Sequence, residues 1–106
     1  MKHVTLIISI IFCVSARAQD VFKLNKILNP YNSKNVQVHS LCSDKFESSY
    51  LIWVVDSVKP HYHAKHTELI HVIEGKGNFY IGDKKYAIEP GDYIRIPQGK
   101  IHSFKT

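Results

Sequence analysis

Short runs of alternating hydrophobic and polar residues, separated by Gly, Pro, Asn and Asp, fill most of the chain after residue 35. This alternation is typical of β-strands with one face buried and the other in solvent. We expect strands at 36–42, within 46–56, and then at 68–73, 78–81, 86–88, 93–96 and near 102. The partly alternating stretch 21–28, closed by the turn signal Asn29-Pro30, predicts a further strand. No helical periodicity competes after residue 20, so the pattern predicts an all-β fold of the jelly-roll barrel or sandwich type.

The stretch 50–55 (Tyr-Leu-Ile-Trp-Val-Val) is apolar without interruption. Such a run predicts a strand buried on both faces. We expect Trp53 to be a core or interface residue, with a place in a ligand pocket as the alternative. In the stretch 36–42, the alternation predicts that His39 is exposed. Cys42 is predicted to be a small buried hydrophobic residue rather than a reactive thiol.

The first twenty residues have a different character. A basic start at Lys2 is followed by an apolar run from Val4 to Val14 and by small residues at Ala16 and Ala18. This is the layout of a secretory signal peptide cleaved after Ala18. The apolar run is short for a bilayer span, which needs about 20 residues. We therefore expect a signal peptide at 1–18 and a domain at 19–106, secreted or periplasmic, without a stable membrane span after processing; the alternatives are a membrane anchor and a first core strand.

Charge argues against one class of partner. The sequence has 14 basic and 9 acidic side chains. Removal of Lys2 and Arg17 with the signal peptide would reduce the net charge from +5 to +3. The remaining lysines are scattered, with no run longer than Lys84-Lys85, so we expect a solvated surface and no nucleic-acid partner.

His61 and His63 stand two residues apart, so in an extended segment their side chains project to the same face. Glu68 begins one apolar run and His102 ends another, so a sheet can bring all four side chains to one point. Three imidazoles and one carboxylate suit Mn, Fe, Ni, Cu or Zn and poorly suit calcium. The leading hypothesis is a divalent transition metal held by these four residues. For each single histidine, the alternative is a hydrogen-bonded surface or core residue.

Two other histidines are close in the sequence. His66 falls in the turn before Glu68, where it can reach the mouth of the site. By alternation His71 shares a face with Leu69 and Ile73, opposite to Glu68, so it should point away from the metal. Neither is predicted to be a ligand.

Gly and Pro residues frame the predicted ligands. Gly75-Lys-Gly77 predicts a tight hairpin connection, with 78–81 as the partner of the strand from Glu68. Gly91 opens a strand, and the turn Pro97-x-Gly99 returns the chain to His102. Pro60 marks a strand start, an edge or a bulge.

These positions resemble the two motifs of the cupin superfamily. The first, H-x-H-x4-E-x6-G, is matched by His61, His63, Glu68 and Gly75, and the second, G-x5-P-x-G-x2-H, by Gly91, Pro97, Gly99 and His102. The resemblance covers about 55–106, with motif 1 at about 61–75 and motif 2 at about 91–102. It implies a cupin-type jelly-roll barrel, or double-stranded β-helix.

The sequence departs from the cupin pattern at two positions. Val55 stands where the first motif usually opens with Gly, and Thr106 stands where the second usually ends with Asn. Cupin barrels usually continue past the second motif, so the resemblance implies either a barrel that lacks its last strands or one in which residues 19–55 or a second subunit supply them. Unpaired sheet edges invite pairing with another chain, and Leu69 and Ile73 are apolar positions on the outer face. We therefore expect a homodimer, the commonest symmetric assembly.

The resemblance also implies a range of functions. These are dioxygenase, decarboxylase, isomerase and lyase chemistry on a small oxygen-rich molecule, dependent on the metal. Tyr80, Tyr93 and Arg95 are candidates for an additional acid or base. The alternatives are a non-catalytic module that binds a small molecule or the metal itself, and an incomplete cupin without activity.

Overall fold

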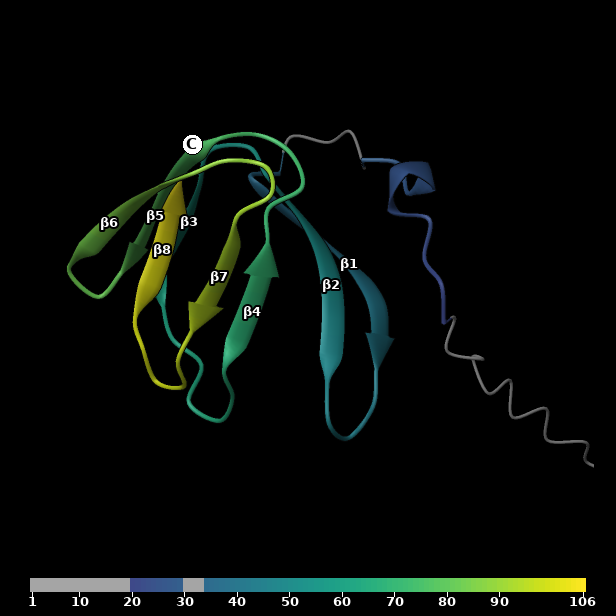
Figure 1. Ribbon diagram of the computed structural model, residues 1–106, viewed down its shortest axis with the longest axis horizontal. Helices are drawn as coiled ribbons and strands as arrows, with labels where there is room; N and C mark the ends of the chain where they lie inside the picture. The colour runs from purple at the N-terminus through teal and green to yellow at the C-terminus, as the bar shows by residue number, and fades with distance from the viewer. Residues whose placement is uncertain (1–19, 30–33) are drawn as a thin grey trace, which may run out of the picture.

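The computed structural model describes residues 20–29 and 34–106 (Figure 1). Within these residues there are β-strands and one 3-10 turn, and no α-helix, which confirms the all-β prediction. The elements are η1 (Leu24–Lys26), β1 (Val36–Ser43), β2 (Ser48–Val54), β3 (Ser57–His61), β4 (Glu68–His71), β5 (Gly77–Ile81), β6 (Lys84–Ile88), β7 (Tyr93–Ile96) and β8 (His102–Lys105).

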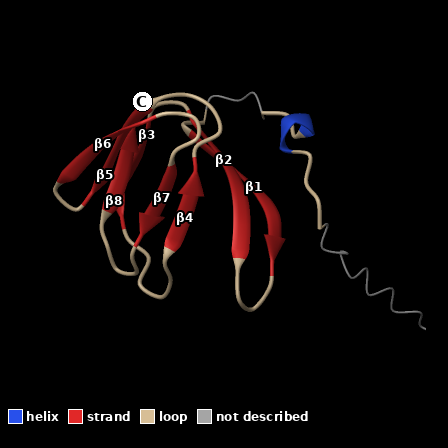
Figure 2. Cartoon of the chain, viewed as in Figure 1, coloured by secondary structure: helices blue, strands red, loops and turns tan. Residues whose placement is uncertain are grey.

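The strands form three antiparallel sheets (Figure 2). The largest has the order β3-β8-β5-β6, so its neighbours are far apart in sequence. β4 pairs with β7, and β1 pairs with β2 as a hairpin. Pairing between distant strands places both ends of the segment 61–102 beside each other, which is what the predicted metal site requires.

The core lies between the β4-β7 pair and the four-stranded sheet. Its buried apolar side chains among the described residues are Phe79 from β5 and Ile94 and Ile96 from β7. Partly buried side chains from both layers pack against them: Ile70, Val72, Ile81, Ile88 and Phe104. Burying a side chain of this size contributes about 1.5–3 kcal/mol to stability. With three buried apolar side chains among the described residues, the core is small.

The predicted hairpin through Gly75-Lys-Gly77 is wrong. β4 pairs with β7, with Glu68 opposite Ile96, whereas β5 pairs with β6 and β8. The segment after β4 crosses from one layer to the other instead of turning back in the same sheet. Gly75 has a φ of +78°, a conformation that side chains with a Cβ disfavour. A glycine in this conformation suits a hairpin turn and a crossover between layers equally well, so the sequence did not distinguish the two connections.

The apolar run 50–55 is not buried on both faces. Tyr50 is 53% exposed and Ile52 is 47% exposed, while Trp53 is half-buried. The reason is that β2 pairs with β1 alone among the described strands, so this hairpin forms a two-stranded sheet. His39 is exposed, as predicted.

Cys42 is half-buried rather than buried. Its thiol donates a hydrogen bond of 3.2 Å to the Glu47 carboxylate. That contact, which disfavours the thiolate, raises the pKa of Cys42. The prediction of an unreactive thiol is thus supported by the hydrogen bond to Glu47 and not by burial.

The strand predicted at 21–28 is also wrong. This stretch contains the 3-10 turn η1, which has no buried residue, and Leu28 is 85% exposed. Apolar alternation forms a strand only where a sheet edge is available for pairing. The predicted signal peptide at 1–18 lies outside the described residues. Within residues 20–29 and 34–106, no helix is long and apolar enough to cross a membrane.

Candidate metal centre

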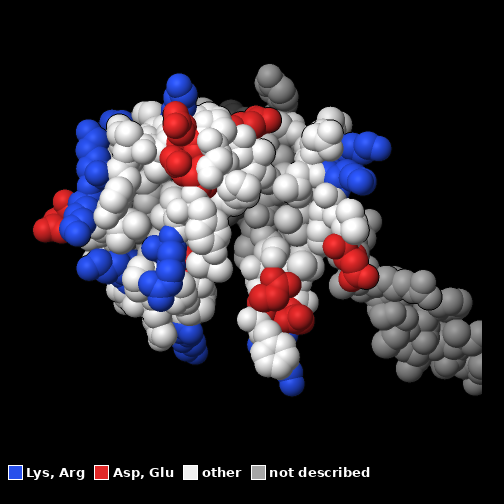
Figure 3. Space-filling view, viewed as in Figure 1, with Lys and Arg blue, Asp and Glu red and all other residues white. Residues whose placement is uncertain are grey.

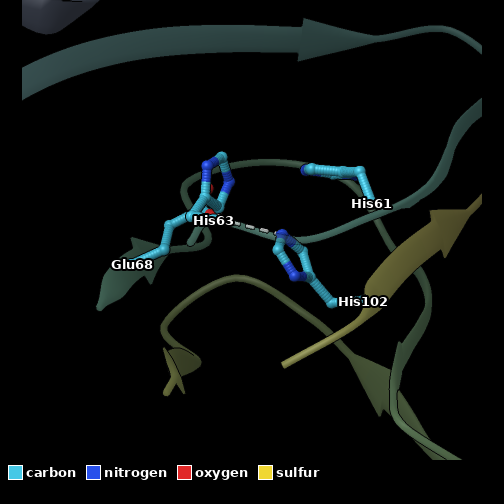
Figure 4. Close-up of side chains that lie close together, drawn as sticks. All are labelled: His61, His63, Glu68 and His102. Atoms are coloured by element: carbon cyan, nitrogen blue, oxygen red, sulfur yellow. Dashed lines mark ion pairs between the residues drawn. The ribbon is translucent and has the colours of Figure 1, made fainter. Parts of the chain in front are cut away.

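Backbone pairing brings the four predicted ligands together. His61 is the last residue of β3 and stands opposite His102, the first residue of β8. Glu68 begins β4 in the facing layer, and His63 lies in the loop between β3 and β4. The β3 ladder shifts register between Val58 and His61, around Pro60, which agrees with the bulge, one of the three alternatives predicted for Pro60. The site therefore joins both layers of the barrel (Figure 4).

The carboxylate of Glu68 is the centre of the group. Its Oε2 atom lies 2.9 Å from Nε2 of His63 and 3.0 Å from Nε2 of His102. The ligand atoms offered by all four residues lie within 4.8 Å of one another. His102 is only 3% exposed, whereas His61, His63 and Glu68 are half-buried, so the site opens to solvent on one side.

Two of the imidazoles are oriented by backbone carbonyls. Nδ1 of His61 lies 2.7 Å from the Lys59 carbonyl, and Nδ1 of His102 lies 3.0 Å from the Lys100 carbonyl. Because a carbonyl oxygen only accepts, each Nδ1 carries the proton and donates it. The lone pair of the neutral ring is then on Nε2, the atom that a metal would use.

The chemistry of this donor set fits a cation. Nε2 of His63, Nε2 of His102 and Oε2 of Glu68 are buried and have no hydrogen-bond partner of suitable geometry among the described residues. In neutral His102 the Nε2 lone pair faces a carboxylate oxygen at 3.0 Å, an arrangement that is repulsive without a positive charge. A divalent ion would satisfy all three atoms at once, whereas one proton on either ring would pair that ring with the Glu68 carboxylate and leave the other ring without a partner. The four residues can therefore hold a metal ion.

Two loops lock the group in place. The Gly99 N–H donates to the His63 carbonyl at 2.8 Å, and the Gln98 side-chain amide donates to the Ala64 carbonyl at 2.6 Å. Gly99 has a φ of +78° and nothing within 4 Å of an added Cβ. The turn at 97–99 in the second motif is thus hydrogen-bonded to the loop that carries His63 in the first motif. Gln98 was not singled out from the sequence, because an amide in a turn carries no signal of a distant partner.

The other candidates lie outside the cluster. The ring of His66 is 4.7 Å from that of His63, centroid to centroid, and His66 is exposed, so it stands at the mouth as predicted. His71 is exposed on the opposite face of β4, also as predicted. Tyr93 and Arg95 are exposed on the outward side of β7, and they are not among the clustered ligands.

Phe79 is a site residue that sequence reasoning missed. Its ring stacks on that of His102, with centroids 6.1 Å apart and planes 14° from parallel. It also lines a groove of about 400 Å³ beside β6 and β7, together with Tyr86, Ile94 and Arg95. Phe79 thus contacts His102 and lines the groove, but none of the four clustered residues lines it. The one sequence signal available was strand alternation, which puts Phe79 and Tyr80 on opposite faces of β5.

Comparison with known proteins agrees with this geometry. A family model described as a cupin domain matches residues 51–106, just over half of the chain. The chain therefore belongs to the cupin domain family, and the prediction from the two motifs is confirmed.

A solved structure and a curated sequence are similar to this chain. KdgF from Halomonas sp. superposes with a TM-score of 0.65 at 18% identity, over 68% of this chain and 67% of that one, so the two share a fold. An uncharacterized protein of Aquifex aeolicus (strain VF5) is 36% identical over 59 residues. The match covers 56% of this chain and 49% of the relative, so the chain spans about half the length of that protein.

Proposed function

We propose that this protein is a secreted or periplasmic cupin that binds Mn, Fe, Ni, Cu or Zn and uses the metal to transform a small oxygen-rich molecule. The observation that carries the proposal is the position of the Glu68 carboxylate oxygen, 2.9 and 3.0 Å from two imidazole nitrogens that have no other partner among residues 20–29 and 34–106. Four protein ligands leave one or two positions free on an ion that takes five or six. Open positions distinguish catalytic sites from closed structural ones.

The bound ion would polarise a carbonyl or carboxylate of the substrate, or lower the pKa of bound water. The chain supplies the surroundings. Phe79 and Ile96 make the adjoining interior apolar, which strengthens electrostatic interactions at the site. His66, beside His63 at the solvent side, is placed to contact a substrate that enters there.

A groove of about 400 Å³ beside β6 and β7, lined by none of the four clustered residues, offers a small molecule a surface apart from the metal ligands. Its volume is in the range of ligand pockets, and it combines an apolar floor with a few polar groups. Arg95 and Tyr93 stand among the lining residues. A guanidinium donates in a fixed fork that matches a carboxylate, so an acidic or hydroxylated ligand suits this rim.

A non-catalytic binding module is the second candidate. One observation favours it: Tyr93 and Arg95, candidates for an additional acid or base, lie on the outward side of β7 and not among the ligands. In such a module the same metal would fix a sugar or carboxylate without turning it over.

The experiment begins with elemental analysis of the full chain isolated from its own host. The proposal requires close to one transition-metal ion per chain, and loss of about one equivalent in Glu68→Gln. Oxygen consumption and substrate loss are then followed for dioxygenase, decarboxylase, isomerase and lyase substrates, with and without a chelator. Turnover that the chelator abolishes supports the enzyme, and stoichiometric metal without turnover supports the binding module. Absence of metal from the wild-type protein would overturn both.

Export is tested separately, by N-terminal sequencing of the protein from culture medium or periplasm. Cleavage after Ala18 predicts that the mature protein begins at Gln19. A protein found only in the cytoplasm with residues 1–18 intact would contradict this part of the proposal.

A further inference from the structure

Lysines that are scattered in the sequence gather on one face of the four-stranded sheet. The ring of Phe79 stacks on His102 and contacts Phe104, so these three side chains mark the inner face of that sheet. Strand neighbours point to opposite faces, and residues directly opposite each other in a ladder share a face. The remaining positions form a surface that we call the outer sheet face: Ser57, Lys59, Asn78, Tyr80, Lys85, Ala87, Ser103 and Lys105.

The outer sheet face is basic and carries no acidic side chain. Lys59, Lys85 and Lys105 are exposed, and none of them forms an ion pair with another described residue. The acidic residues nearest to them in the chain lie outside the strands: Asp56, Asp83 and Glu89. Figure 3 shows Lys and Arg side chains along the left margin of the molecule, where β5 and β6 lie. Unpaired charges of one sign on one face attract a partner of the opposite sign.

Tyr80 stands at the centre of the outer sheet face. It is directly opposite Lys85 on β6 and Ser103 on β8, and Lys105 lies two residues further along β8. The side chains of Asn78, Tyr80 and Ser103 form no hydrogen bond with another described residue, so their donors and acceptors are open to a partner. Since Tyr80 points out of the barrel, it is not placed as an additional acid or base at the metal cluster.

This combination of groups suits an acidic polysaccharide. Lysine ammonium groups pair with carboxylates or sulfates, and the hydroxyl and amide groups between them bond to sugar hydroxyls. The ring of Tyr80 offers an apolar surface to the flat face of a sugar while its hydroxyl stays in water. We propose that the outer sheet face binds an acidic polysaccharide, with Lys59, Lys85 and Lys105 on its charges and Tyr80 against a sugar ring.

Two other polyanions match this surface less closely. An anionic membrane would be expected to meet apolar side chains as well as lysines, and none of the exposed large hydrophobic residues belongs to the outer sheet face. Single-stranded nucleic acid is usually held by several aromatic rings and by arginine, whereas this face has one aromatic ring and no arginine. Each exposed ion pair is weak, but a polymer with repeated charges engages the three lysines together.

The outer sheet face and the metal cluster lie on opposite sides of the same sheet. His102 points into the barrel from β8, whereas Ser103 and Lys105 of the same strand point out. Substitutions on the outer sheet face therefore leave the four clustered residues in place. The elemental analysis that tests the metal and the binding measurements below can fail independently of each other.

Titration of the full chain with chondroitin sulfate at low salt, followed by calorimetry, tests the proposal. Binding should weaken as NaCl is added, because salt screens exposed charges, and neutral dextran should not bind. The double variant Lys85→Gln, Lys105→Gln should bind about 10-fold more weakly, since it loses two exposed ion pairs. Tyr80→Ala should bind about 3-fold more weakly, since it loses a ring contact. Circular dichroism checks that each variant is folded.

The matched control is the double variant Lys23→Gln, Lys26→Gln. It removes the same charge from exposed positions around η1, which Figure 1 shows apart from the four-stranded sheet. Its binding should change by less than about 2-fold. Equal losses in the two double variants would show a general attraction to a basic protein and would overturn the proposal. Absence of binding at low salt, or tighter binding to single-stranded DNA or to phosphatidylserine vesicles than to chondroitin sulfate, would also overturn it.

Discussion

Oε2 of Glu68 lies 3.0 Å from Nε2 of His102, while the other nitrogen of that ring is 3.0 Å from the Lys100 carbonyl. The carbonyl fixes the proton on the far side of the ring, so two electron-rich atoms face each other at the centre of the site. This relationship is one that a bound cation would stabilise, and its consequences can be measured.

Replacing Glu68 with Gln should weaken metal binding by about 100-fold or more. The change keeps the size of the side chain but removes the charged oxygen that contacts both His63 and His102. Changes in residues that only support ligands already cost about 10–100-fold, so loss of a ligand should cost at least as much. Metal titration with a competing chelator measures the affinity.

The control for that titration is His66→Gln. His66 contacts the ring of His63 but is not among the clustered ligands. Metal affinity should change by less than about 3-fold, within the ordinary effect of a surface substitution. An equal loss in both variants would mean that the ligands are assigned wrongly.

Replacing Gly99 with Ala should lower both stability and metal affinity. The φ of +78° costs a residue with a Cβ about 1–2 kcal/mol, and relaxation of the turn would disturb the Gly99 N–H bond to the His63 carbonyl. Denaturant unfolding measures stability, and chelator competition measures affinity. Gly75→Ala is the matched control, because Gly75 has the same φ and also has nothing within 4 Å of an added Cβ. It should lose stability while keeping the affinity for metal; equal affinities in both variants would contradict this role of Gly99.

Phe79→Ala should destabilise the protein by about 3–5 kcal/mol, as expected for deletion of a buried aromatic ring. Phe79 is 6% exposed, lies at the centre of the small core and stacks on His102. Urea unfolding of the metal-free and metal-loaded forms measures the loss. Phe46→Ala, at an 83% exposed position, should change stability by less than about 0.5 kcal/mol. Comparable losses in the two variants would show that the core is elsewhere.

Cys42 should react slowly with iodoacetamide at neutral pH. The hydrogen bond to Glu47 and the negative charge of its carboxylate raise the pKa of the thiol, so the nucleophilic thiolate forms only at higher pH than usual. Glu47→Gln should shift the pH profile of alkylation toward lower pH and speed the reaction near neutrality. Ser48→Ala, which removes a hydroxyl bonded to Ser43 and not to Cys42, is the control. An unchanged profile in Glu47→Gln would contradict this account.

The clustering of His61, His63, Glu68 and His102 could be predicted from the sequence because their spacing carries the information. His61 and His102 lie opposite each other in a ladder, and Glu68 begins the strand of the facing layer. Strand alternation also placed His39, His71 and Leu69 correctly on exposed faces. These are local properties of the chain.

The errors come from properties that are not local. The connection through Gly75 was mistaken for a hairpin, since a left-handed glycine serves a turn and a crossover equally well. The burial of Tyr50 and Ile52 was overestimated, because an apolar run does not tell how many strands will cover it. The strand predicted at 21–28 fails for the related reason that a strand needs a partner edge. Phe79 was overlooked because its importance depends on its contact with His102.

The ligands of the candidate metal centre are divided between the two layers, with His61 and His102 on the four-stranded sheet and Glu68 on the β4-β7 pair. A bound ion is therefore a cross-link between layers that few buried side chains hold together. Chelation would therefore remove the cross-link between the two layers as well as the metal of the candidate site. The metal-free protein should consequently be digested faster by proteases, at loops that the loaded protein keeps closed.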